Sequence, residues 1–129
     1  GGLGQQQLTM ETLREWDYGD YEGITTPEIR KSIPNWTVWN HGCPNGEDAL
    51  AVQQRCGQTI EIALAAPGEG DVALFAHGHL LRALTGTWLG LGATAGRYFQ
   101  LGTGTICILG FERGQRIIAR WNAPTNSLF

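Results

Sequence analysis

The spacing of apolar residues predicts two long helices in the middle of the chain, separated by one buried strand. From Glu47 onward, apolar residues recur at helical spacing, at Val52, Cys56, Ile60, Ala63 and Leu64. The run 72–76 is continuously apolar, as in a strand that is covered on both faces. A second helix is expected directly after this strand, over about 80–89.

The N-terminal third predicts short elements joined by loops. Residues 8–22 are expected to be extended or loop, and residues 41–46 form a loop by composition. The threonine and proline at 25–28 mark a helix start, and this helix should end before Pro34. Trp36 and Trp39 stand three residues apart, which predicts one more helical turn that packs both indoles inward.

Near the C-terminus the pattern changes to that of strands. Three strands are expected over 98–101, 105–111 and 116–121, with a turn joining the last two. Helix, buried strand, helix and then strands predict an α/β fold in which helices cover a sheet. In such sheets ligands bind beyond the carboxyl ends of strands, which is where His77-Gly78-His79 falls.

Composition excludes several classes of function. Lys and Arg number 9 against 12 Asp and Glu, so the net charge of −3 offers no basic field to a nucleic acid or an anionic membrane. No apolar run reaches the about 18 residues of a membrane span. The three cysteines form no C-x-x-C pair, which argues against a disulfide framework and a zinc knuckle. With no signal-peptide pattern at residues 1–7, we expect a cytoplasmic protein.

His77 is the first candidate for chemistry. A histidine between a strand and a helix start faces free backbone N–H groups and the helix dipole, which together favour an anion. A protonated imidazole would add a donor for a phosphate oxygen, and Arg82 could add a planar fork one helical turn later. The alternatives are a structural histidine at a strand end, or a metal pair with His79. His41 lies in a Gly/Pro loop and is expected to be exposed.

The second candidate is an acidic and aromatic segment over 15–23, which holds four carboxylates. A general acid needs a carboxyl group that stays protonated near neutral pH, and apolar neighbours such as Trp16 favour that form for Glu15. The alternative is a solvated acidic loop with core aromatics. Glu47 and Asp48 are expected to favour a helix start by their charge, and Gly102-x-Gly104 is too weak to indicate phosphate binding.

Four motifs occur together, in this order: Leu13-x-Glu15-x-x-x-Gly19-Asp20-Tyr21-Glu22-Gly23, Gly42-Cys43-Pro44-x-Gly46-Glu47, Phe75-Ala76-His77-Gly78-His79-x-x-Arg82 and Trp121-Asn122. Their order and spacing resemble the histidine phosphatase (phosphoglycerate-mutase-like) superfamily through nearly the whole chain. The wording around Glu15 is most similar to the branch of acid phosphatases and sugar bisphosphatases, rather than to the glycolytic mutases.

The resemblance implies a mechanism and roles. In that family a phosphoryl group moves from the substrate to a histidine and then to water, with no cofactor or metal. Glu15 matches the general acid and His77 the second histidine, which binds the phosphoryl group. Tyr18, Gly78, His79 and Arg82 match substrate-binding positions. The implied fold is a three-layer αβα sandwich with a mostly parallel sheet.

One departure from the family pattern is severe. The family nucleophile lies in an Arg-His-Gly motif, and this sequence contains no Arg-His dipeptide. Residues 1–129 are therefore expected to be the C-terminal portion of one such domain, to lack its N-terminal strand, and to be inactive alone. The partner would be a small phosphorylated substrate, and an exposed sheet edge would favour pairing with a second copy.

Alternative functions stay open from the sequence. The chain could belong to a phosphoglycerate mutase, or to a non-catalytic module that binds phosphorylated ligands through His77 and Arg82. A metal hydrolase ranks third.

Overall fold

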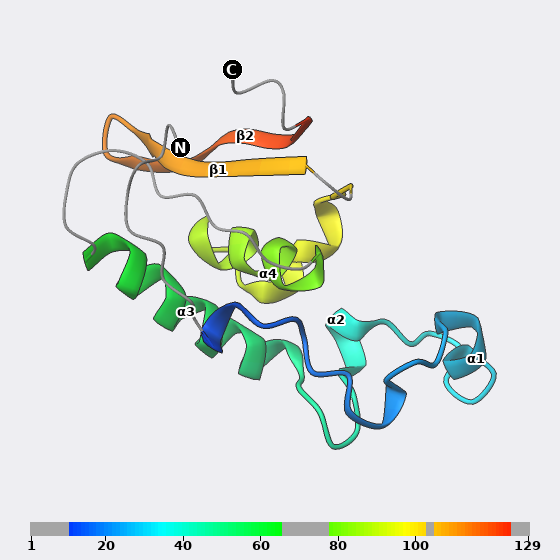
Figure 1. Ribbon diagram of the computed structural model, residues 1–129. Coiled ribbons are helices and arrows are strands. Elements are labelled where there is room, and N and C mark those ends of the chain that lie inside the picture. The colour runs from blue at the N-terminus through cyan, green and yellow to red at the C-terminus, as the bar shows by residue number, and fades with distance from the viewer. Residues whose placement is uncertain (1–10, 66–77, 103–104, 125–129) are drawn as a thin grey trace.

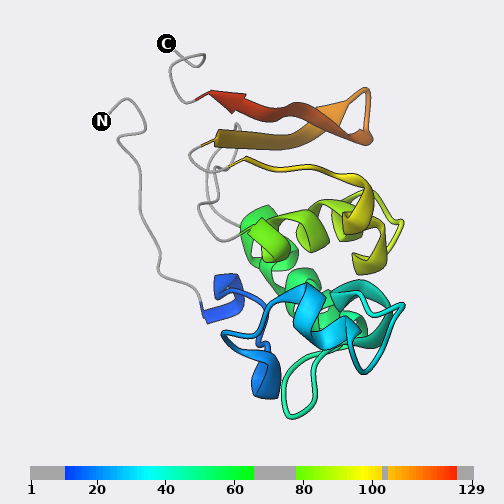
Figure 2. The ribbon, with the colours of Figure 1, turned by 90° about the vertical axis from the view of Figure 1, so that its right-hand side faces the viewer.

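A computed structural model describes residues 11–65, 78–102 and 105–124, in which short and long helices lie beside a β-hairpin (Figure 1). The elements in chain order are η1 (Glu11–Leu13), η2 (Gly19–Tyr21), α1 (Thr26–Arg30), α2 (Val38–His41), α3 (Ala49–Ala65), α4 (Gly78–Trp88), η3 (Ala93–Tyr98), β1 (Thr105–Glu112) and β2 (Gln115–Pro124). Figures 1 and 2 show the hairpin lying over α4, while α1, α2 and η2 gather at the opposite end.

The helix starts follow from capping side chains. Thr25 Oγ1 accepts a hydrogen bond from the Glu28 amide and begins α1, as its sequence predicts. Thr37 caps α2 in the same way, so the turn that Trp36 and Trp39 predict begins at Val38. Both indoles are buried, which confirms that the two tryptophans point inward.

The two long helices form where they were expected and supply half of the buried hydrophobic core. In α3, Val52, Cys56 and Ile60 face the core, but Leu64 is 50% exposed because it lies in the last helical turn, beyond the core face. Helix α4 packs against α3, and the apolar side chains of its inner face are fully buried.

The C-terminal hairpin confirms two of the three expected strands. Strands β1 and β2 pair antiparallel, and the turn between them places Arg113 and Gly114 at positive φ, as type I′ turns require. The hairpin contacts α4 through Trp88, whose indole Nε1 donates to the Ile117 carbonyl.

The strand expected over 98–101 was wrong. Tyr98 ends the 3-10 helix η3 and is largely exposed, and no described strand pairs with the residues after it. The Gln100 carbonyl instead accepts a hydrogen bond from the Trp121 indole. Phe99 also packs against the Trp121 ring with ring centres 5.5 Å apart, so this segment contacts the hairpin without forming a strand.

The described sheet has two antiparallel strands, which agrees with an α/β fold but contains no parallel pair. The strand predicted over 72–76 and the turn after α3 lie outside the described residues, so the parallel sheet and the three-layer sandwich stay predictions. None of the described helices is long and apolar enough to cross a bilayer. Cys43, Cys56 and Cys107 are free thiols, and the first two are buried.

Candidate active site

Glu15 is held at the N-terminus of α4. Its Oε1 atom accepts hydrogen bonds from the Trp16 amide at 2.8 Å and from the Leu80 amide at 3.0 Å. Leu80 is the third residue of α4, so the carboxylate accepts a hydrogen bond from one of the first-turn amides that have no partner within the helix. Two segments separated by 65 residues thus meet at this carboxylate.

Tyr18 and His79 form a second contact across the same junction. The Tyr18 hydroxyl and His79 Nδ1 share a hydrogen bond of 2.5 Å. Burial raises the pKa of Tyr18 above its usual value, and the charge and hydrogen bond of the Glu15 carboxylate raise it further. The phenol therefore stays protonated over the physiological range and links Glu15 to His79.

His79 is enclosed by aromatic rings. The ring centres of Trp39, Tyr18 and Trp16 lie 5.7, 5.8 and 6.5 Å from the centre of its imidazole, each in an edge-on arrangement. Burial lowers the pKa of His79, an effect that the negative charge of Glu15 opposes and the positive charge of Arg82 reinforces. His79 is therefore mainly neutral at pH 7, and its second ring nitrogen is free of the bond to Tyr18.

The guanidinium of Arg82 is partly engaged in holding the fold. Its Nε donates to the Gly96 carbonyl at 3.0 Å, its Nη2 donates to the Arg97 carbonyl, and it lies 5.2 Å above the Trp39 ring. The predicted substrate role of Arg82 would use its remaining N–H groups and stays a prediction.

Of the three remaining candidate positions, the structure describes Gly78 and His41. Gly78 begins α4, is exposed, and has open space where a side chain would project, so its backbone is accessible to a ligand. His41 is exposed, as expected. His77 lies outside the described residues, so its predicted role stays a prediction. Within the described ranges, no group of three or more His, Cys, Asp or Glu residues could hold a metal ion.

An ion pair beside the site was missed from the sequence, because Arg55 was not singled out and Glu47 was given another role. Arg55 is buried on α3 and forms a salt bridge of 2.8 Å with Glu47. Glu47 was expected to favour a helix start by its charge, which was wrong, because its side chain instead binds Arg55 and the Asp17 amide. Asp48 begins α3, since its Oδ1 accepts from the Ala51 amide. The sequence offered one signal for this ion pair. Arg55 stands between the core positions Val52 and Cys56 on α3, so a buried arginine that needs a partner could have been expected.

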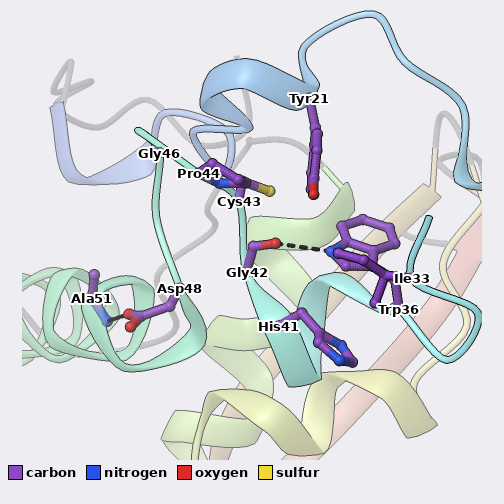
Figure 3. Close-up of a pocket in the computed structure, with 10 residues that line it drawn as sticks. All are labelled: Tyr21, Ile33, Trp36, His41, Gly42, Cys43, Pro44, Gly46, Asp48 and Ala51. Atoms are coloured by element: carbon purple, nitrogen blue, oxygen red, sulfur yellow. Dashed lines mark hydrogen bonds between the residues drawn. The ribbon is translucent and has the colours of Figure 1, made fainter. Parts of the chain in front are cut away.

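A cavity of about 560 Å³ lies beside the 42–46 loop, which forms part of its wall (Figure 3). Its walls include Tyr21 from the acidic segment, Trp36 and the thiol of Cys43, and the Trp36 indole donates to the Gly42 carbonyl across it. Burial raises the pKa of Cys43 to about 11, so the thiol is uncharged at neutral pH. None of the candidate site residues lines this cavity.

Comparisons with known proteins show which family the chain belongs to. The family model of the histidine phosphatase superfamily (branch 1) matches residues 1–124. The chain belongs to this superfamily. This histidine phosphatase chain is 46% identical over 107 residues to an acid phosphatase of Mycobacterium tuberculosis, which covers 83% of the chain and 53% of that relative. It is 40% identical to the sedoheptulose 1,7-bisphosphatase of Saccharomyces cerevisiae, covering 64% of the chain and 36% of that relative.

Solved structures agree on the histidine phosphatase α/β fold. An open-reading-frame product from Mycobacterium tuberculosis superposes with a TM-score of 0.84 at 43% identity, covering 89% of this chain and 60% of that one. The α-ribazole phosphatase of Shigella flexneri superposes with a TM-score of 0.72 at 21% identity, covering 94% of this chain and 64% of that one, which supports the fold alone. The chain spans about half or less of the length of the curated relatives it matches.

Proposed function

We propose that this histidine phosphatase chain supplies the proton donor and the phosphate-binding groups of a phosphomonoester hydrolase. The substrate would be a small phosphorylated metabolite, such as a sugar phosphate or bisphosphate. The observation that carries the proposal is the Glu15 carboxylate bound to the first turn of α4 beside the Tyr18–His79 pair. The relatives named as an acid phosphatase and a sugar bisphosphatase support hydrolysis of a phosphoester.

The proposed reaction has two steps. In the first, a histidine nitrogen attacks phosphorus, the bond to the ester oxygen breaks, and the Glu15 carboxyl gives its proton to that oxygen. In the second, water attacks the phosphohistidine, the P–N bond breaks, and the Glu15 carboxylate takes the proton of the water. The attacking histidine lies outside these 129 residues in this proposal, because the sequence has no Arg-His-Gly motif.

The groups at the start of α4 would stabilise the transferring phosphoryl group. Phosphoryl transfer depends on in-line placement and on fixed positive charge around the equatorial oxygens. The N-terminal amides of α4 provide partial positive charge, while His77 and Arg82 would add full charges. Gly78 leaves the backbone open to the phosphate, and His79 would contact it through the ring nitrogen that does not bond to Tyr18.

Two measurements test the proposal. Inorganic phosphate or orthovanadate should shift the NMR signals of the Gly78 and His79 amides, and His77→Ala should weaken that binding. The chain alone, incubated with a labelled phosphomonoester, should accumulate no acid-labile phosphate.

The catalytic role of Glu15 needs a chimera in which an Arg-His-Gly segment from another branch 1 histidine phosphatase precedes residue 1. General-acid help is typically worth about 10²–10⁴ in rate, so Glu15→Gln should lower kcat by that factor. Glu61→Gln, an exposed carboxyl on α3, is the matched control. Equal activity of the Glu15→Gln chimera and its parent would show that the donor is another group. Phosphate binding by a chimera that never turns over would favour the non-catalytic binding module.

A further inference from the structure

We propose that Arg55 and Glu47 are positioning residues that hold Glu15 and Tyr18 in their working geometry. The proposal rests on the function proposed above for Glu15. Neither residue touches the reacting groups. They act through the backbone of residues 12–17, which we call the acid segment.

Arg55 uses all five of its N–H groups. Its Nη1 donates to the Thr12 and Arg14 carbonyls at 2.9 and 2.7 Å, and its Nη2 reaches the Glu15 carbonyl at 3.4 Å. The other two donors form a two-pronged pair with the carboxylate of Glu47, at 2.9 and 2.8 Å. A guanidinium offers five donors in a rigid planar fork. One side chain therefore holds three carbonyl groups of the acid segment.

Glu47 grips the same segment from its other side. Its Oε1 accepts from the Asp17 amide at 2.9 Å, and its own amide donates to the Asp17 carbonyl at 2.8 Å. Its carbonyl accepts from the Trp16 indole Nε1 at 2.9 Å. Glu47 thereby holds the two residues between Glu15 and Tyr18.

Burying this charged pair costs desolvation free energy, which its hydrogen bonds must offset. The Arg55 and Glu47 side chains are only 7% and 12% exposed. A buried ion pair contributes little net stability compared with apolar residues of the same volume. Burial alone would raise the pKa of Glu47, but the hydrogen bonds from Arg55 and the Asp17 amide outweigh it and lower that pKa. An apolar pair could not bind the four backbone groups that these side chains hold, which are the Thr12, Arg14 and Glu15 carbonyls and the Asp17 amide, and that is the use we assign to it.

The geometry explains why Glu15 depends on the pair. Residues 14–18 have no regular secondary structure of their own. The Glu15 backbone is bound from α3 by Arg55, while its carboxylate is bound from α4 by the Leu80 amide. Removing the first anchor leaves the acid segment free to shift, and the carboxylate then leaves the Leu80 amide and the Tyr18 hydroxyl.

The test uses the chain as it is and needs no ligand. In Arg55→Met, hydrogen exchange at the Leu80 amide should rise about tenfold or more, and the ionisation of the Tyr18 phenol should shift toward its ordinary value of 10. Exchange at the Leu84 amide, in the buried middle of α4, should stay within about twofold. Glu28→Gln, which removes an exposed ion pair with Lys31, is the matched control and should change none of these.

Each outcome decides the question. Equal acceleration at Leu80 and Leu84 would mean that Arg55 only stabilises the fold, and unchanged Leu80 exchange would mean that Glu15 does not need it. If Arg55→Met does not fold, Glu47→Gln serves instead, since it keeps the shape and removes only the charge. Arg55→Lys keeps the positive charge but lacks the planar guanidinium, so hydrogen exchange at the Leu80 amide should stay close to that of Arg55→Met. Phosphate titration of the parent chain fails if the proposed function is wrong, whereas these readouts do not depend on it.

Discussion

Replacing Gly19 with alanine should detach the start of η2 from the 42–46 loop. Gly19 has φ = +51°, and a Cβ there would lie 2.2 Å from the Pro44 carbonyl oxygen and 2.5 Å from the Gly46 nitrogen. Gly23 also has positive φ, +78°, but no atom lies within 4 Å of its would-be Cβ. Gly19→Ala and Gly23→Ala therefore differ only in the clash.

The magnitude follows from that comparison. An alanine in the left-handed region costs about 1–2 kcal/mol, a term that both variants share. Overpacking costs typically about 1–3 kcal/mol, and the upper part of that range applies at Gly19 because the opposing atoms are backbone. The free energy of unfolding should thus fall by about 2 kcal/mol more in Gly19→Ala than in Gly23→Ala.

Urea unfolding measures this difference. With a slope near 2 kcal/mol per molar urea, the midpoint of Gly19→Ala should lie about 1 M below that of Gly23→Ala. The fluorescence of buried Trp16 reports the transition. Equal midpoints for the two variants would refute the close packing of Gly19 against the 44–46 backbone.

Three further predictions concern stability. Among the described residues, Thr12 Oγ1 is the one buried side-chain polar atom without a hydrogen-bond partner, so Thr12→Val should raise the free energy of unfolding by about 1 kcal/mol; a loss in urea unfolding would contradict this. Gly57 lies inside α3 with nothing within 4 Å of a would-be Cβ, so Gly57→Ala should raise stability by about 0.5–1 kcal/mol, seen as a higher Tm. Because the folded pKa of Tyr18 lies above its ordinary value of 10, its contribution to stability is present below pH 10 and is lost as the pH rises beyond that value. Urea midpoints above pH 10 should therefore fall more steeply in the parent chain than in Tyr18→Phe, and equal slopes would show that this phenol is not perturbed.

Local signals in the sequence predicted the local structure well. Capping threonines, the helical spacing of Val52, Cys56 and Ile60, and the turn between two alternating runs each act within a few residues, so the sequence displays them directly. The strand expected over 98–101 failed because Tyr98 ends the 3-10 helix η3, and the Gln100 carbonyl binds the Trp121 indole instead of a neighbouring strand.

The candidate site was predictable only in part. The motifs pointed to Glu15, Tyr18 and His79, and the structure brings these three together. Their contacts span more than 60 residues of sequence, a separation that no periodicity reports. Arg55 was missed for the same reason, because its carbonyl partners at Thr12 and Arg14 come from a segment with no pattern of its own.

Glu15 hangs between two helices, with its main chain tied to α3 and its side chain tied to α4. Any movement of α3 relative to α4 would therefore change the orientation of the Glu15 carboxyl group. Substitutions at the interface of α3 and α4, even far from Glu15, would then retune the acid without touching it.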